Sequence, residues 1–217
     1  MYNVAEIIEF LQKWQTLIGS IIGGLIALFV AVIVSWTATR REQRISAILV
    51  ISDVMQFRAA YENLTKIAEE QNVAPNQYPM WVAEKLSWSR PRLSLLFEAN
   101  MARVISVDAR LGAHLSLFRT ACASLDEHLV RLDEDAQRFW GRTSQNGIPR
   151  NPQETATDAR VVAGALALAA KHAAYAEYFL SALVLSRVPA FIKRIRMRVN
   201  PNDWDKESKK LLTEGYV

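Results

Sequence analysis

The stretch that decides the fold is residues 14–39, which read WQTLIGSIIGGLIALFVAVIVSWTAT. None of these 26 residues is charged, and their centre is almost entirely aliphatic. About 20 apolar residues suffice for an α-helix to cross a hydrocarbon core of about 30 Å. Trp14 and Trp36 stand near the two ends, where aromatic side chains favour the membrane interface. We therefore predict a single transmembrane helix over 15–38.

A cleavable signal peptide is the main alternative for an apolar segment near the N-terminus. Such a leader has a basic start, a shorter apolar core and a small-x-small cleavage site. Here Glu6 and Glu9 precede the apolar run, and Lys13 is the only cation before it. Residues 35–38, SWTA, do not form a good cleavage site of this kind. We therefore expect the helix to be retained as an anchor.

The cations that follow the apolar run predict its direction across the membrane. Arg40, Arg41 and Arg44 come directly after it, with Glu42 as the only acid among them. Positively charged flanks stay on the cytoplasmic side of a membrane. We therefore predict an N-terminus outside and the bulk of the chain in the cytoplasm, and we assign the protein to a bacterial inner membrane.

One face of the predicted span carries small residues at a spacing of four. These are Gly19, Gly23, Ala27, Ala31 and Ser35. Small side chains at this spacing let two helix backbones approach closely, as they do in dimers of membrane helices. Glycine is also frequent in membrane helices in general. The face therefore predicts a homo-oligomer or a partner membrane helix, and an unpaired span is the alternative.

The rest of the chain has apolar residues at helical spacing and no alternating strand pattern. Apolar steps of three and four over 47–68 predict that the anchor helix continues without a break to about Asn72. Three further helices are predicted: 80–87, a helix of about 45–50 residues from Pro91, and a last long helix from Pro152 to about Arg187. The fold class is all-α: a single N-terminal transmembrane helix that continues into an antiparallel bundle of long helices.

This prediction divides the chain into four parts. Residues 1–14 form a short amphipathic segment, which either lies at the membrane interface or extends the span. Residues 15–38 form the transmembrane helix, and 39–200 form the cytoplasmic helical bundle. Residues 201–217 are a polar C-terminal tail that we expect to be loosely ordered.

Residues 161–186 are the one further stretch that is nearly long and apolar enough to cross a membrane. They are rich in alanine and leucine, but they contain Lys171, His172 and Glu177. A charge at the centre of a span costs about 2.5–3.5 kcal/mol, and alanine offsets little of this. We therefore predict an inner helix of the bundle. The alternative is a two-span subunit of a transport or channel complex, in which these three side chains line a polar path.

Motifs for catalysis, cofactors or metals are not found in the sequence. None of His114, His128 and His172 has a glutamate three residues before it, as the di-iron pattern of helical bundles requires. The single cysteine, Cys122, excludes an intrachain disulfide and falls on an apolar helical face, so we predict a core residue. We interpret His128 and the acids near it as a solvated acidic helix face. The catalytic, cofactor and metal sites are therefore predicted as none.

A basic segment at 191–198, FIKRIRMR, is the one distinctive charged feature. We predict that its cations contact the membrane surface together with those after the span: Lys193, Arg194, Arg196 and Arg198 with Arg40, Arg41 and Arg44. A solvated helix end is the alternative. Nucleic acid is not an expected partner, because the net charge of the whole chain is only +4.

These features predict a single-pass membrane protein without catalytic activity, which acts as a membrane-tethered helical scaffold or interaction module. The expected partners are the lipid bilayer, a second copy or another membrane helix, and a protein that the sequence does not identify.

Overall fold

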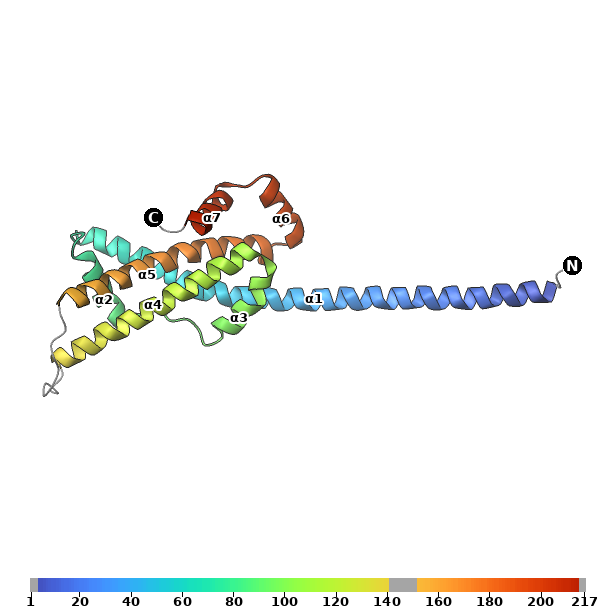
Figure 1. The fold of residues 1–217 in the computed structure, drawn as a ribbon, viewed down its shortest axis with the longest axis horizontal. Coiled ribbons are helices and arrows are strands. Elements are labelled where there is room, and N and C mark those ends of the chain that lie inside the picture. Colours follow the sequence, from blue (N-terminus) through green and yellow to red (C-terminus); the bar gives the residue numbers. More distant parts are fainter. Residues whose placement is uncertain (1–3, 141–151, 215–217) are drawn as a thin grey trace. The chain divides into compact units, whose positions relative to one another are not determined.

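The computed structural model describes residues 4–140 and 152–214, and every regular element in these ranges is helical (Figure 1). The elements are α1 (Val4–Glu70), α2 (Tyr78–Trp88), α3 (Phe97–Val104), the 3-10 helix η1 (Ile105–Val107), α4 (Ala109–Trp140), α5 (Pro152–Phe179), the π-helix η2 (Leu180–Leu185), α6 (Ala190–Val199) and α7 (Asp203–Glu214). The predicted all-α class is confirmed in the part of the chain that the structure describes.

The chain divides into two compact units, residues 1–42 and residues 43–217, and α1 contributes to both. In the first unit α1 begins at Val4 and continues into the apolar run without interruption. Residues 4–14 of the predicted amphipathic segment are thus part of the same helix. Among the described helices, α1 alone is long and apolar enough to cross a membrane.

The end of α1 lies close to the predicted position and is closed by a Schellman motif. Asn72 adopts a left-handed conformation with φ 52°. Its backbone N–H donates to Glu69 O at 3.1 Å, and the N–H of Val73 donates to Ala68 O at 2.9 Å. These two bonds satisfy carbonyls that the last turn of the helix would otherwise leave free.

The second unit has its own hydrophobic core, in which α4 and α5 lie side by side and α1 and α2 pack against them (Figure 1). Phe118 on α4 lies at its centre, with its ring centroid 5.3 Å from that of Phe57 on α1 in an edge-to-face contact. On α5 the buried side is largely alanine, for example Ala169 and Ala173, which are both fully buried. Alanine adds little bulk and therefore lets α4 and α5 approach closely.

The predicted long helix from Pro91 is wrong in two places. Residues 90–96 are not helical, because Ser94 Oγ donates to Asp53 Oδ2 of α1 at 2.7 Å and holds this segment against α1. The helix that follows is broken at Asp108, whose backbone is extended. Asp108 Oδ1 accepts the backbone N–H of Arg110 at 2.9 Å, so this residue begins a new helix. The helical spacing of the apolar residues persists across the break and conceals it.

The predicted polar tail also differs from the structure, since α7 is a helix that packs on the second unit. Asn202 and Asp205 form a capping box at its start. The N–H of Asp205 donates to Asn202 Oδ1 at 2.8 Å, and the N–H of Asn202 donates to Asp205 Oδ2 at 3.3 Å. Ser208 is fully buried, which a loosely ordered tail would not allow.

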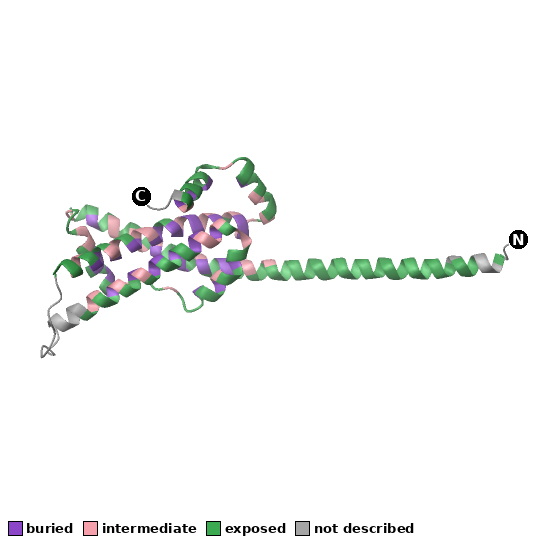
Figure 2. Cartoon of the chain, in the orientation of Figure 1, coloured by how far each residue is buried: buried purple, intermediate pink, exposed green. Residues whose placement is uncertain are grey.

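The last long helix begins at Pro152 as predicted, and its helical backbone ends at Leu185 as a π-helix. Residue 151, the predicted N-cap, lies outside the described residues. Pro189 precedes α6 with an extended backbone, so the chain turns there instead of continuing the helix. Half of the residues of the predicted inner helix, 161–186, are buried in the second unit, and most of the others are partly buried (Figure 2).

Candidate membrane-contact site

The apolar side chains in the α1 run of the first unit are exposed among the described residues. The large hydrophobic side chains of this run between Leu17 and Val34 are 43% to 67% exposed, with Ile33 and Phe29 at these limits. Figure 2 shows this part of the helix as exposed along its length. No residue in its most apolar window is buried. An apolar surface of this extent is far larger than the patches that monomeric soluble proteins normally expose to water.

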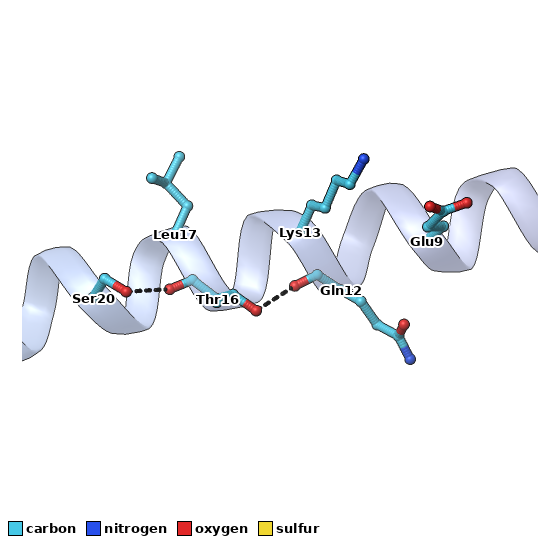
Figure 3. A pocket seen from close by; sticks show the side chains of 6 residues that line it. All are labelled: Glu9, Gln12, Lys13, Thr16, Leu17 and Ser20. Carbon is cyan, nitrogen blue, oxygen red and sulfur yellow. Dashed lines mark hydrogen bonds between the residues drawn. The ribbon is translucent and has the colours of Figure 1, made fainter.

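The polar side chains at the N-terminal end of this run are satisfied by the helix itself. Thr16 Oγ1 donates to Gln12 O at 3.0 Å, and Ser20 Oγ donates to Thr16 O at 2.9 Å. These residues line a shallow hollow together with Glu9, Lys13 and Leu17, and all six side chains project from one helix (Figure 3). Because one helix alone forms the hollow, we assign no ligand to it. The hydroxyls need no water, which suits a helix entering lipid.

The predicted pairing face is open. A Cβ atom added at Gly19 or at Gly23 would meet nothing within 4 Å. Ala27, Ala31 and Ser35 are exposed as well. Among the described residues this face is therefore accessible to another helix, and pairing stays a prediction.

The predicted membrane-surface cations belong to both units. In the first unit the Arg40 guanidinium lies 5.1 Å from the ring centroid of Trp36, a cation–π contact near the end of the apolar run. In the second unit Arg44 donates to Ser186 O at 3.0 Å. This bond joins the first turns of α1 in that unit to the segment that leads into α6. Arg41, also on α1, is exposed, and the other four predicted cations, Lys193, Arg194, Arg196 and Arg198, lie on α6.

A buried polar cluster in the second unit was not predicted from the sequence. His114 on α4 has its Nδ1 2.9 Å from His172 Nδ1 on α5, and its Nε2 2.7 Å from Ser208 Oγ on α7. Burial lowers the pKa of His114 to about 3, with smaller contributions from His172 and Arg110. Burial and then Lys171 lower the pKa of His172 to about 4. Both imidazoles are therefore neutral near pH 7.

The Ser208–His114 contact resembles the nucleophile–base pair of a hydrolase, but its surroundings do not fit that chemistry. Both residues have no exposed surface, so a substrate has no path to the hydroxyl. The group behind His114 is a second imidazole, whereas a carboxylate normally orients the base. We interpret the cluster as a hydrogen-bond chain that docks α7 onto α4 and α5.

Arg110 fixes the other end of α7 and also holds α6. Its Nη1 donates to Asp205 Oδ1 at 3.3 Å, and its Nη2 lies 3.6 Å from the sulfur of Met197 on α6. The guanidinium also lies 4.8 Å from the ring centroid of Phe179. One side chain at the start of α4 thus joins the two C-terminal helices to the core. The capping-box pattern at Asn202 is the sequence signal that would have revealed α7.

His128 does not belong to a solvated acidic helix face, as predicted, because it has a buried partner on another helix. His128 Nδ1 lies 2.7 Å from Asp158 Oδ1 on α5, and Asp158 is only 5% exposed. The histidine therefore joins α4 to α5 instead of belonging to a solvated acidic face. The prediction for Cys122 is confirmed, since this residue is 2% exposed in the core and burial raises the pKa of its thiol.

The three polar residues of the alternative two-span interpretation have separate environments. Lys171 is exposed, whereas His172 is buried against His114. Glu177 Oε2 accepts from Arg58 Nη1 on α1 at 2.8 Å.

Within residues 4–140 and 152–214 no group of three His, Cys, Asp or Glu side chains is placed to hold a metal ion. Comparison of the chain with protein-family models, with curated proteins and with solved structures gave no match.

Proposed function

We propose that this chain is a single-span membrane protein whose second unit is a helical interaction module without catalytic activity of its own. The observation that carries the proposal is the apolar run of α1, whose 26 uncharged residues include a window with no buried residue. The second unit, by contrast, buries many of its apolar side chains in a core of its own. A lipid bilayer is the environment that would cover the first unit.

The proposed orientation has the N-terminus outside and the second unit in the cytoplasm of a bacterial cell, at the inner membrane. Support comes from Arg40, Arg41 and Arg44, which follow the span, whereas the residues before it are close to neutral.

We further propose that the helices of the second unit form an antiparallel bundle. The consecutive helices α4 and α5 lie side by side (Figure 1). Because only residues 141–151 connect them, close packing along their lengths favours opposite directions.

The proposed role in protein interaction is supported by exposed side chains at the end of α2 and just before α3. Trp88 is 87% exposed and Leu95 is fully exposed, with Leu96 beside it at 62%. Large aromatic and aliphatic side chains of this kind are frequent anchors of protein interfaces. The anchor would keep this surface at the membrane, where a partner meets it.

Cysteine labelling of the intact protein in sealed membrane vesicles tests the topology. Single cysteines replace Tyr2, Arg150 and Asn200 in a Cys122→Ala background. We expect positions 150 and 200 to react on the cytoplasmic side and position 2 on the other side. Labels at 150 and 200 on opposite sides would mean that α5 crosses the membrane, and the two-span transport or channel interpretation would replace ours.

Co-purification from membranes tests the interaction role. A partner recovered with the native protein should be lost when Trp88 and Leu95 are both changed to serine, while Val130→Ser, at another exposed apolar position, retains it. Equal recovery with both variants would contradict the proposed surface.

A further inference from the structure

We infer that α6 is an interfacial helix that lays its outward apolar face on an anionic lipid surface. This inference rests on the proposed membrane anchor and assigns a second, independent lipid contact to the cytoplasmic unit. It concerns α6 (Ala190–Val199), AFIKRIRMRV, which follows the turn at Pro189.

The rotation of α6 about its own axis is fixed by the core of the second unit. Met197 is the buried residue of this helix, at 8% exposed, and its sulfur contacts Arg110. Successive residues of an α-helix are about 100° apart around the axis. Phe191, Ile195 and Val199 therefore fall within about 80° of one another and roughly opposite Met197.

The face that points away from the protein is thus the apolar one. Phe191 and Ile195 are each 59% exposed, Val199 is 80% exposed and Ile192 is 46% exposed. A helix that only covers the core of a soluble domain has the reverse arrangement, with its apolar face inward and its polar face in water. The outward apolar face of α6 calls for a cover that the described chain does not supply.

Charge identifies the cover as an anionic surface. The helix contains four cations, Lys193, Arg194, Arg196 and Arg198, and no acidic residue. Arg198 and Arg196 are exposed, and at about 100° per residue they border the apolar face on its two sides. This is the pattern of an interfacial helix, whose apolar residues enter the acyl boundary while its cations meet lipid phosphates. A protein groove would need acids on both rims to match it.

The connection of α6 to α1 places a membrane within reach. Ser186, just before the turn into α6, accepts a hydrogen bond from Arg44. Arg44 follows Thr39, the last residue of the uncharged run, by five positions. Even a fully extended chain covers at most about 18 Å over five residues. If the run spans the bilayer, the start of α6 is therefore close to the headgroups, whatever the orientation of the second unit.

Depth-dependent quenching in vesicles tests the inference on the full chain. A polarity-sensitive fluorophore is attached to Ile195→Cys in a Cys122→Ala background, and the protein is reconstituted into phosphatidylcholine vesicles with or without phosphatidylglycerol. Val130→Cys is the matched control, because Val130 is an exposed apolar residue on α4. We expect lipids spin-labelled near the headgroup to quench the label at 195, more strongly with phosphatidylglycerol, and to leave the label at 130 unquenched.

Charge reversal gives a second measurement. Arg196→Glu with Arg198→Glu should lower the ratio of lipid-docked to free α6 by at least about 30-fold, since the loss of each cation near an anionic surface is worth about a factor of five and the new carboxylates are repelled by the same surface. Lys209→Glu with Lys210→Glu, two exposed cations on α7, is the control and should leave quenching at 195 unchanged.

The outcomes separate this inference from the anchor. If the protein remains in the vesicles but the label at 195 is as exposed to water as the label at 130, the anchor is retained and the lipid contact of α6 is overturned. A label at 195 that is shielded from water but not quenched by lipid is covered by protein, either a second copy or a partner, and this also overturns the inference. A protein that does not stay with the vesicles overturns the anchor and this inference with it.

Discussion

The apolar run of α1 and helix α5 are both long, apolar and rich in small residues. The α1 run is exposed, whereas one side of α5 is buried in the core of the second unit. No residue in the most apolar window of α1 is buried, whereas α5 has buried residues in every turn from Asp158 to Phe179. The difference lies in composition around the helix. The α1 run is aliphatic on every side, but α5 has an exposed Lys171 and a Glu177 that is bonded to Arg58. A bilayer requires an apolar surface all round, while a protein core requires only one apolar face.

Two arginines in the α1 run should have the largest effect. Leu25→Arg with Phe29→Arg adds about 6 kcal/mol to the cost of membrane insertion. We expect the protein to leave the membrane fraction after an alkaline carbonate wash. Leu117→Arg with Val130→Arg, at exposed positions on α4, should not change the distribution. If the double variant in α1 stays in the membrane, the run is not the anchor.

One arginine in α5 should destabilise the second unit but leave the protein in the membrane fraction. Leu166 is 1% exposed, and Leu166→Arg buries an unpaired charge, which we expect to lower the free energy of unfolding of the second unit by about 4 kcal/mol. The protein should still sediment with membranes. Gly164→Arg is the control, since Gly164 is exposed and a Cβ there meets nothing. Loss of membrane association on Leu166→Arg alone would favour α5 as a span.

Acid should lower the free energy of unfolding of the second unit, which contains α5, without affecting the apolar run of α1. The pKa values of His114 and His172 are lowered to about 3 and about 4 in the folded unit, from 6.5 when unfolded. At a pH between the folded-state and the unfolded-state pKa values, the unfolded state binds protons that the folded state does not. The contribution of the two histidines to the free energy of unfolding is therefore largest above about pH 6.5 and is lost as the pH falls. We expect a loss on the order of 3 kcal/mol between pH 7 and pH 5.

Urea unfolding of the detergent-solubilised protein at both pH values measures this loss. The double variant His114→Gln with His172→Gln should have a smaller difference between the two pH values. An equal difference would mean that other groups cause the pH dependence.

The smallest effect is expected at the small-residue face of α1. Gly19→Leu with Gly23→Leu would fill the open space on this face and weaken helix pairing about tenfold. Energy transfer between labelled copies in vesicles, over a series of protein-to-lipid ratios, measures the association. The control is Ile18→Leu with Leu25→Ile, which changes two residues on the other side of the helix. Equal association of both variants would contradict pairing through this face.

Helix content and the main helix ends could be predicted because they depend on neighbours in the sequence. The uninterrupted apolar run, the end of α1 near Asn72 and the start of α5 at Pro152 are all local signals. The break at Asp108 and the capping box at Asn202 are local too, but apolar spacing alone does not predict them, because both depend on polar side chains that bond the backbone.

Other parts of the second unit could not be predicted in this way. The segment 90–96 has a proline that favours a helix start, but Asp53, 41 positions away from Ser94, holds it in another conformation. A bond of this kind is decided by packing, because it forms only when α1 already lies beside the segment.

The sequence by itself determined the 26-residue uncharged run, the helical class and the four cations of 191–198. Hydropathy, charge and helical spacing are sums over neighbouring residues, so they need no knowledge of the fold. The tertiary structure decided that Met197 points inward and so directs the apolar face of α6 outward. It also decided the partners of His114, which lie 58 and 94 positions away in the chain. Contacts over such distances exist only after the helices pack, because packing sets the rotation of each helix about its axis.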